Sequence, residues 1–398
     1  MGINTKVIPR LLGHHFRFLS VVFCFWFSTY IYVPTFGVYL NLLDIGYYAT
    51  GLILGSYGIM QVLIRFPLGI LADRYQISGK WLVAWGMIAS FMSAILFGLT
   101  DSFLPALFGR LLAGVTAAMW VVLTIWYSTE FHENQSMKAM GLLQTTTVAS
   151  QFISMAISGW MADLLGFKSL FWIGGVFALL GLMLVISLPD GKKSREQRKM
   201  PGPGVLQIMK NGKLWTVSLL SLLVHAVLFS TIFGFSPVYF HHFNHHTAAV
   251  ILLVVAFMLP HTFAPFLLSI KKGKLQNPFL TLAICFATGA GSLAFMGNTK
   301  SWLVYCILHV ILGFFLGIVF PILLDQVYQA DPTKTTMGFY QSFYSFGIVF
   351  GPIAAGFIAK NANIAAVFTM SAILLAVGGI IVIAAPKKTA KKTVADAM

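Results

Sequence analysis

The sequence predicts an all-α membrane protein whose twelve transmembrane helices form two pseudo-symmetric bundles of six. Composition is the first observation, because 58% of the 398 residues are hydrophobic and only 9% are charged, whereas a soluble domain carries about 25% charged residues. The second is a series of long apolar runs separated by short polar breaks. The third is an internal repeat that relates the two halves of the chain.

The apolar runs are long enough to cross a bilayer, which takes about 20 residues in a helix. A membrane β-barrel is excluded, because it needs alternating segments of about ten residues and runs such as Phe91–Leu99 do not alternate. We expect helices near residues 16–40, 46–71, 81–100, 103–128, 139–162, 169–188, 213–240, 247–270, 277–297, 301–324, 338–359 and 364–385.

Positive charge is concentrated on one side of the predicted membrane. Of 26 Lys and Arg residues, 21 fall in the N-terminal segment, the even-numbered loops, the central linker and the C-terminal tail, and only Lys168, Lys300 and Lys360 fall in odd-numbered loops. By the positive-inside rule, both termini of this multi-pass protein face the cytoplasm. The net charge of +15 then reflects orientation in the cell membrane and contact with anionic lipids, and it does not indicate nucleic acid as a partner.

A polar segment rich in Gly and Pro divides the chain into two predicted bundles. We expect an N-terminal six-helix bundle over 1–189, a cytoplasmic linker over 190–212, and a C-terminal six-helix bundle with a short basic tail over 213–398. The halves also repeat, since Met140, Gly141 and Gln144 recur 197 positions later. Duplicated halves with a site between them are typical of alternating-access transporters.

The segment after the second predicted helix carries a recognisable motif. Gly69, Asp73 and Arg74 match the pattern Gly-x-x-x-Asp-Arg-x-Gly-Arg-Lys, although Gln76 stands where the pattern has its second Gly. The chain therefore resembles the major facilitator superfamily, in particular its twelve-helix transporters of drugs and other solutes. The resemblance implies that Asp73 docks at the end of a second-half helix and stabilises the outward-open state, since a carboxylate is favourable at a helix N-terminus.

Two further helices carry parts of this resemblance. In the fourth predicted helix, Arg110 precedes Gly114 and several small residues, similar to the family's helix-4 motif. In the eleventh, Gly351, Pro352 and Gly356 allow a kink and close helix packing. The family's antiporters carry such a motif in helix 5, and its absence there in this chain weakens the case for an antiporter.

Ionisable residues within the predicted helices are the candidates for substrate binding and proton coupling. No acidic residue lies at the midpoint of a predicted helix, so His225, His261 and His309 are the groups there that titrate near neutrality. The resemblance implies that helices 1, 4, 7 and 10 line the cavity, which favours Arg110, His225 and His309. Asp325, at the inner end of helix 10, is a weaker candidate.

Other polar residues are candidates for the same cavity. Gln61 and Arg65 lie four apart and thus on one face of helix 2, and Tyr30 lies near the middle of helix 1. Two alternatives are open for each arginine. Arg110 either faces the protein interior, as intramembrane charges usually do, or extends to the outer headgroups, and Arg65 either lines the cavity or extends inward. An unpaired Arg110 makes the cavity electropositive and favours a substrate with an anionic or strongly electronegative group.

Motifs for metals, cofactors and catalysis are weak or missing in the sequence. Four histidines in the loop after helix 7 are a weak candidate for Zn or Ni: His241, His242, His245 and His246. The three cysteines lie in predicted helices and suggest neither a disulfide framework nor a metal site. We expect no cofactor and no enzymatic activity.

The sequence thus predicts a monomeric secondary transporter for a small organic solute or amphiphile, driven by protons or membrane potential, with export as the expected direction. Uptake of an anionic metabolite is the alternative within transport. A sensor or assembly factor that kept the fold without transporting is the alternative outside it. Substrate, direction and coupling ion are left open by the sequence.

Overall fold

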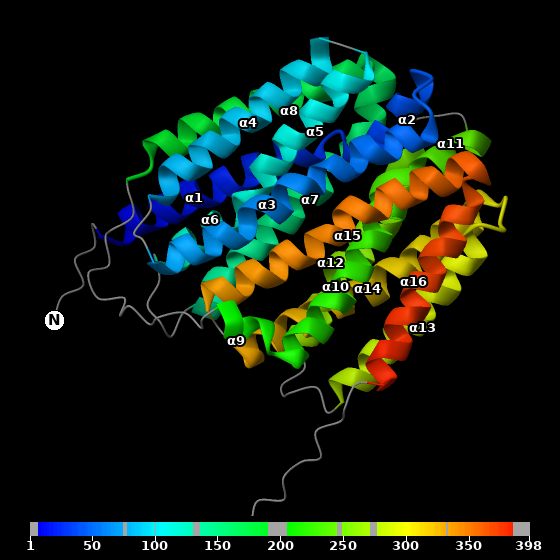
Figure 1. Cartoon of the computed structure of the whole chain (residues 1–398). Coiled ribbons are helices and arrows are strands. Elements are labelled where there is room, and N and C mark those ends of the chain that lie inside the picture. The colour runs from blue at the N-terminus through cyan, green and yellow to red at the C-terminus, as the bar shows by residue number, and fades with distance from the viewer. Residues whose placement is uncertain are drawn as a thin grey trace, which may run out of the picture.

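The computed structural model describes residues 7–74, 78–99, 101–129, 136–189, 205–244, 249–270, 277–331 and 333–384. Helices and short turns account for this part of the chain, which contains no strand (Figure 1). The first half of the chain forms α1 (Val7–Tyr30), α2 (Val33–Leu42), α3 (Tyr47–Arg74), α4 (Gly79–Leu99), α5 (Phe103–Ala118), α6 (Trp120–Thr129), α7 (Ser136–Leu165) and α8 (Phe167–Ser187).

The second half of the chain begins with a short helix in the segment that the sequence predicts as a linker. Its elements are α9 (Val205–Met209), α10 (Gly212–Ser230), the π-helical turn η2 (Thr231–Phe235), α11 (Ser236–Asn244), α12 (Val250–Ile270), α13 (Pro278–Met296), α14 (Trp302–Ala330), α15 (Lys334–Asn361) and α16 (Ala365–Ala384).

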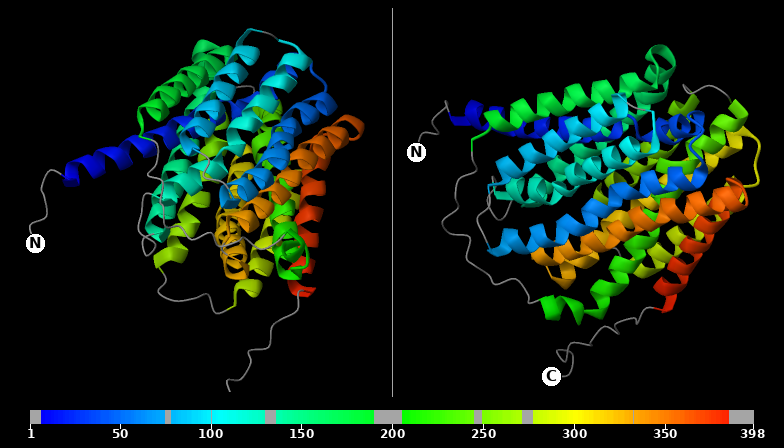
Figure 2. Two further views of the ribbon diagram at one scale, coloured as in Figure 1. Left: turned by 60° about the vertical axis from the view of Figure 1, so that its left-hand side comes forward. Right: turned by 45° about the horizontal axis from the view of Figure 1, so that its top comes forward.

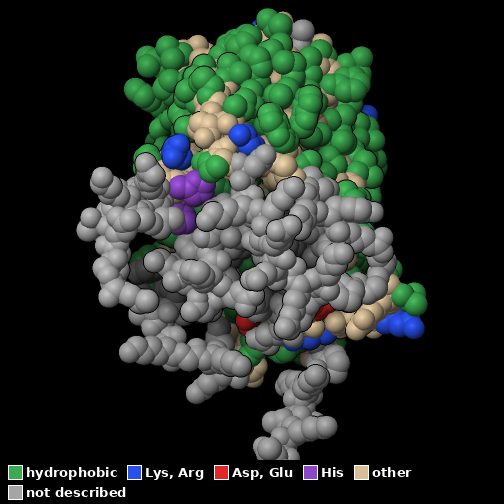
Figure 3. Space-filling view, turned by 90° about the vertical axis from the view of Figure 1, so that its left-hand side faces the viewer, with side chains coloured by type: hydrophobic (Ala, Val, Ile, Leu, Met, Phe, Trp, Pro, Cys, Tyr) green, Lys and Arg blue, Asp and Glu red, His purple; other side chains and the backbone are tan. Residues whose placement is uncertain are grey.

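Twelve helical spans are present when consecutive elements are joined. Eleven described segments are long and apolar enough to cross a membrane, and α12 supplies a shorter described apolar stretch, Val250–Pro265. The prediction of an all-α, twelve-helix membrane fold is therefore confirmed. Many large hydrophobic side chains are exposed on the outside, and Figure 3 shows hydrophobic side chains over most of the upper part of that view.

Three spans that the sequence predicts as single helices are interrupted. The first divides between α1 and α2 just before Pro34, which has no N–H to continue the helical bonding. The fourth divides at Met119, between α5 and α6. The seventh contains η2, where bonding shifts from the α-helical pattern to the wider π-helical one. Hydrophobic runs do not reveal these interruptions, because both sides of each break are equally apolar.

Helices α3 and α15 lie side by side along most of their length (Figures 1 and 2). Glycines permit this approach: a methyl added at Gly58 would lie 2.8 Å from Val349, and one added at Gly338 would lie 3.2 Å from the Cα of Gly69. We call this contact the α3–α15 seam. It joins the two halves of the chain through small residues, as is common for helices in membranes.

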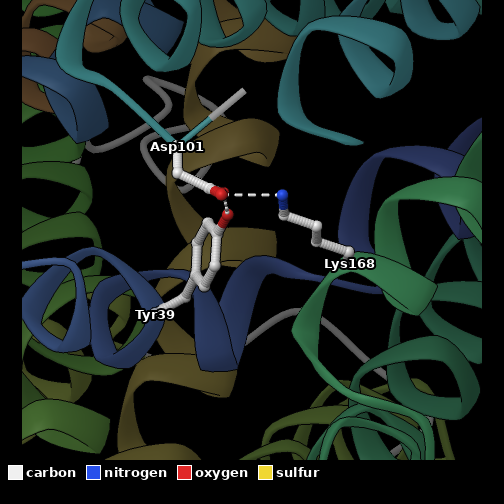
Figure 4. Close-up of polar contacts among 3 residues, drawn as sticks. All are labelled: Tyr39, Asp101 and Lys168. Carbon is white, nitrogen blue, oxygen red and sulfur yellow. Dashed lines mark hydrogen bonds and ion pairs between the residues drawn. The ribbon is translucent and has the colours of Figure 1, made fainter. Parts of the chain in front are cut away.

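A polar group at one end of the bundle ties α2, α8 and the segment before α5 together (Figure 4). The Tyr39 hydroxyl donates to the Asp101 carboxylate, and Lys168 Nζ donates to Asp101 Oδ2 at 2.7 Å. The hydrogen bond from Lys168, followed by the one from Tyr39, lowers the pKa of Asp101 below its ordinary value. Both charged side chains are partly open to solvent, so the pair contributes little to stability.

Candidate functional site

Arg110 lies inside the protein, among aromatic rings. Its side chain is 2% exposed, and its guanidinium carbon lies 4.4 Å from the ring centroid of Tyr57, with Phe36 at 5.7 Å and Tyr32 at 5.9 Å. Nη1 reaches the Tyr32 hydroxyl at 3.5 Å, and Nε has no hydrogen-bond partner among the described residues. Of the two orientations that the sequence leaves open, the structure shows the inward one, in which cation–π contacts hold the guanidinium.

Arg65 is a second buried arginine, and it crosses the α3–α15 seam. From α3, Nη1 donates to the Tyr344 hydroxyl at 2.9 Å and to Ser345 Oγ at 3.1 Å, both in α15. Nη2 donates to the Ala117 carbonyl of α5 at 3.2 Å. The side chain is 3% exposed, and its Nε has no partner among the described residues. Arg65 thus bonds to both halves of the chain and does not extend to the membrane surface.

Gln61 lies one turn before Arg65 and is also buried. Its side-chain amide donates to the Tyr57 carbonyl at 2.9 Å, within α3. The same residue, Tyr57, presents its ring to Arg110. In the described structure Gln61 is therefore bonded within α3, between Tyr57 and Arg65.

No carboxylate accompanies either guanidinium inside the described part of the protein. The buried charged residues there are Arg65 and Arg110, and Asp325 is exposed. A buried charge without a counter-charge costs several kcal/mol unless polar groups, water or an anion offset it. Both buried guanidinium groups of the described protein therefore lack a buried counter-charge, and the electropositive cavity stays a prediction.

Aromatic side chains from both halves gather near the two arginines. Tyr30 lies beside Tyr57 and contacts the Phe233 ring of η2, with centroids 5.9 Å apart. The ring centroid of Trp26 lies 5.4 Å from that of Tyr30 and 5.3 Å from that of Trp120 in α6. The indole Nε1 of Trp26 has no partner among the described residues. The sequence singles out Tyr30 but not the other four aromatic residues, because a membrane helix rich in aromatics gives no signal that separates inward rings from lipid-facing ones.

His225 of α10 joins this cluster through Tyr344. The two rings are stacked, with centroids 3.9 Å apart and planes 8° from parallel, and Tyr344 accepts the hydrogen bond from Arg65. His225 Nδ1 donates to the Ser221 carbonyl at 2.7 Å. The structure therefore brings together Arg65, Tyr344 and His225 from three helices that are distant in sequence.

The other two intramembrane histidines have different surroundings. His309 is enclosed in a ring of hydrogen bonds: its Nδ1 donates to the Tyr305 carbonyl at 2.8 Å, and its Nε2 lies 2.7 Å from Ser236 Oγ, which in turn contacts the Tyr305 hydroxyl. His261 Nδ1 donates to the Gly313 carbonyl at 3.2 Å. Among the described contacts, neither ring touches a buried arginine.

The remaining candidates lie at the ends of helices or at helix crossings. His242 Nε2 lies 3.3 Å from the Tyr47 hydroxyl, His241 is half-buried, and His245 and His246 lie outside the described residues. No group of three His, Cys, Asp or Glu residues that could hold a metal occurs in the part searched. The side chains of Asp73 and Arg74 also lie outside the described part of the chain, so the predicted latch stays a prediction.

The candidate packing glycines lie at close helix contacts. A methyl at Gly114 would overlap the Tyr57 carbonyl, one at Gly351 would lie 2.7 Å from the Ala226 Cα, and one at Gly356 would lie 2.9 Å from the Gly51 Cα. Pro352 lies within α15, in the same region of the seam. These residues set helix spacing around the cluster.

Fold and site together define a polytopic membrane protein with a positively charged, aromatic cluster between two sets of helices. Residues 18–336 match the Major Facilitator Superfamily, and the chain belongs to this family of transporters. The inner membrane transport protein YajR of Escherichia coli (strain K12) is 22% identical over 386 residues, which cover 94% of this chain and 80% of that protein.

Two further matches differ in how much of each chain they cover. An uncharacterized transporter of Buchnera aphidicola subsp. Schizaphis graminum is 28% identical over 162 residues, but the match spans only 41% of this chain and 40% of that protein. The crystal structure of the nucleoside transporter NupG superposes with a TM-score of 0.68 at 18% identity, covering 92% of this chain and 98% of that one. At this identity the likeness concerns the fold.

Proposed function

We propose that the chain is a secondary active transporter for a small organic anion, or for an amphiphile with a strongly electronegative group, and that it works by alternating access. The observation that carries this proposal is the pair of buried guanidinium groups, Arg65 and Arg110, without a buried carboxylate in the described protein. An anion that enters between them replaces water as the counter-charge and gains charge-assisted hydrogen bonds.

The unpartnered nitrogens supply the donors for such a ligand. Nε of Arg65 and Nε of Arg110 have no partner among the described residues, and Trp26 Nε1 is a third free donor nearby. The rings of Tyr30, Trp120 and Phe233 provide apolar surface for the body of an aromatic or aliphatic solute. A ligand that uses both kinds of contact has a charged head and an apolar body, and is therefore an amphiphile.

Movement of the two halves supplies the transport step in this proposal. The six-helix bundles rock about the α3–α15 seam, and Arg65 bonds across it in the present conformation. Opening the seam removes these bonds, while a bound anion compensates for their loss. Ligand binding therefore shifts the balance between conformations only as far as its affinity differs between them. Asp73 acts as the latch that the family resemblance implies.

Direction and orientation complete the proposal. We place both termini in the cytoplasm, from the distribution of Lys and Arg, and a single chain as the working unit. Export is the direction that the resemblance to solute-efflux members favours. Uptake of an anionic metabolite is the second candidate. The two buried arginines favour it, because they favour an anionic substrate, and an anion can move inward together with a proton.

A thermal-shift series on the purified protein tests the substrate class. Benzenesulfonate, benzamide and phenyltrimethylammonium share a phenyl ring and differ in charge. We expect benzenesulfonate alone to raise the melting temperature with concentration, because a ligand stabilises the state that binds it. Stabilisation by the cation without stabilisation by the anion would overturn the proposed class. Counterflow in proteoliposomes of known orientation then distinguishes export from uptake.

A further inference from the structure

His225 differs from His309 in how its two ring nitrogens are used, and from His261 in what its ring contacts. Nδ1 carries its hydrogen toward the Ser221 carbonyl at 2.7 Å, which leaves Nε2 as the nitrogen with a lone pair. None of the described contacts involves Nε2, and the residue as a whole is half-buried. A proton from water can therefore add at Nε2 without breaking an existing bond.

His309 and His261 lack this combination. At His309, both nitrogens are engaged and the residue is 1% exposed, so a proton at Nε2 would require the Ser236 hydroxyl to change from donor to acceptor. At His261, Nδ1 is likewise bonded to a carbonyl, that of Gly313, but no described contact links its ring to an arginine. Only the His225 ring is stacked on a residue that Arg65 holds.

The charged and titratable groups that face His225 are few. Arg65 approaches it from α3, Tyr344 stacks on it from α15, and Tyr340 of α15 donates to Ser221 Oγ at 2.9 Å beside it. From α14 it meets the uncharged ring of Phe320, with centroids 5.1 Å apart. No carboxylate is part of this set among the described residues.

We infer that Nε2 of His225 is the proton-binding site that couples transport to a proton gradient. The positive charge of Arg65 makes proton binding at this site depend on a bound anion. The inference rests on the proposed anionic substrate. The Nε2 lone pair takes a proton from water on one side of the membrane and returns it to water on the other. Nδ1–H stays on the Ser221 carbonyl throughout.

The coupling follows from the charges. A proton on His225 next to the Arg65 guanidinium places two positive charges together in a medium of low dielectric constant. An anion bound beside them offsets both, so anion and proton each favour the binding of the other, as linkage requires. Because Arg65 belongs to α3 while His225 and Tyr344 belong to α10 and α15, opening the seam also changes the distance between the two charges. The result is symport of a proton with the anion, which under an inward proton gradient corresponds to uptake, the second of the two proposed directions.

The test uses benzenesulfonate as the probe, because its sulfonate stays ionised over the whole range used. Its dissociation constant is measured on the purified full-length protein between about pH 8 and about pH 6, the range around the ordinary titration of histidine. For wild type we expect the dissociation constant to fall toward acid pH by up to about tenfold per pH unit, the slope for one coupled proton. The variant His225→Gln should bind benzenesulfonate with less than about a twofold change across this range.

The variant His261→Gln is the matched control, since His261 is also half-buried and bonded to a carbonyl through Nδ1. It should keep the wild-type slope. If His225→Gln binds the probe and keeps that slope too, the inference is overturned while the proposed substrate class stands.

A second readout needs no ligand, and a second substitution covers the case in which His225→Gln fails to fold. In spectra of wild type labelled with ¹³C at histidine, the resonance that is absent from His225→Gln, or from His225→Asn, belongs to His225. We expect it to titrate between about pH 8 and about pH 5, and to do so at higher pH with benzenesulfonate present. A signal that stays in the neutral form throughout overturns the inference. If wild type does not bind benzenesulfonate at any pH, the proposed substrate class fails, and the ligand-free titration alone decides on His225.

Discussion

Arg65 in α3 donates a hydrogen bond of 2.9 Å to the hydroxyl of Tyr344 in α15. A buried cation from the first half of the chain is thus held by a neutral side chain from the second half, and the same tyrosine ring lies flat against His225. This one contact connects the positive charge, the seam between the halves and a group that can carry a proton.

Replacing Tyr344 by Phe removes the hydroxyl and keeps the ring. We expect the protein to lose about 1–3 kcal/mol of stability, because a donor on Arg65 is left without an acceptor. We also expect benzenesulfonate to restore more stability than it adds to wild type. Thermal unfolding with and without the probe measures both effects. Tyr340→Phe is the control, since Tyr340 bonds to Ser221 and not to arginine. Equal ligand effects in both variants would contradict the assigned role of Tyr344.

A side chain at Gly58 should separate α3 from α15. The added Cβ would lie 2.8 Å from Val349 and 2.9 Å from the Ser345 carbonyl, and overpacking of this kind costs about 1–3 kcal/mol. We expect Gly58→Leu to lower the melting temperature and the rate of counterflow. Gly291→Leu serves as the control, because nothing lies within 4 Å of its added Cβ. Similar losses in both variants would show that the seam has no special part in the cycle.

Asp101 should contribute a small, pH-dependent stability. Its pKa is lowered by Lys168 and Tyr39, so the contribution is present above the unfolded-state pKa of about 3.9 and is lost as the pH falls through the folded-state pKa. We expect Asp101→Asn to cost less than about 1 kcal/mol, since the pair is exposed. The difference from wild type should be constant between about pH 8 and about pH 5, begin to shrink at about pH 4, and disappear only below the folded-state pKa. A difference that grows toward acid pH would contradict this assignment.

Asp73 should act on the conformational balance rather than on folding. We expect Asp73→Asn to lower transport, to leave the yield of folded protein unchanged, and to shift cysteine crosslinking across the outer cavity toward the inward-open population. A latch at a helix N-terminus is worth about 0.3–1 kcal/mol, which is enough to shift a near-balanced equilibrium several-fold. Unchanged transport together with unchanged crosslinking would refute the latch.

Much of this architecture could be predicted because a bilayer leaves few choices. Runs of apolar residues give the number of helices, and the motif of Gly69, Asp73 and Arg74 gives the family. Chain interruptions at Pro34, Met119 and η2 could not be placed in the same way. They are local changes in backbone bonding, which the length and apolarity of a run do not specify.

The sequence predicts the charged and titratable residues of the candidate site, but not the neutral residues that surround them. Arg65, Arg110 and His225 stand out in an apolar sequence because a charged or titratable group inside a membrane is costly. Tyr344, Ser345 and Trp120 do not stand out, since a tyrosine, serine or tryptophan in a membrane helix has many ordinary explanations. The same limit applies to His309, which the sequence ranks with His225 but which the structure places in a closed set of hydrogen bonds.

The most direct test of the central claim is the affinity of Arg110 variants for benzenesulfonate at constant pH. Arg110→Lys keeps the charge and loses the broad contact with Tyr57, whereas Arg110→Gln and Arg110→Ala remove the charge. If Arg110 contributes to an anion site, removing its charge should weaken binding by about 10- to 100-fold, corresponding to a charge-assisted hydrogen bond of about 1.5–3 kcal/mol, and Arg110→Lys should fall between. If Arg110→Ala binds the anion as tightly as wild type, or if wild type prefers phenyltrimethylammonium, the account of an anion-binding site between the two halves is wrong.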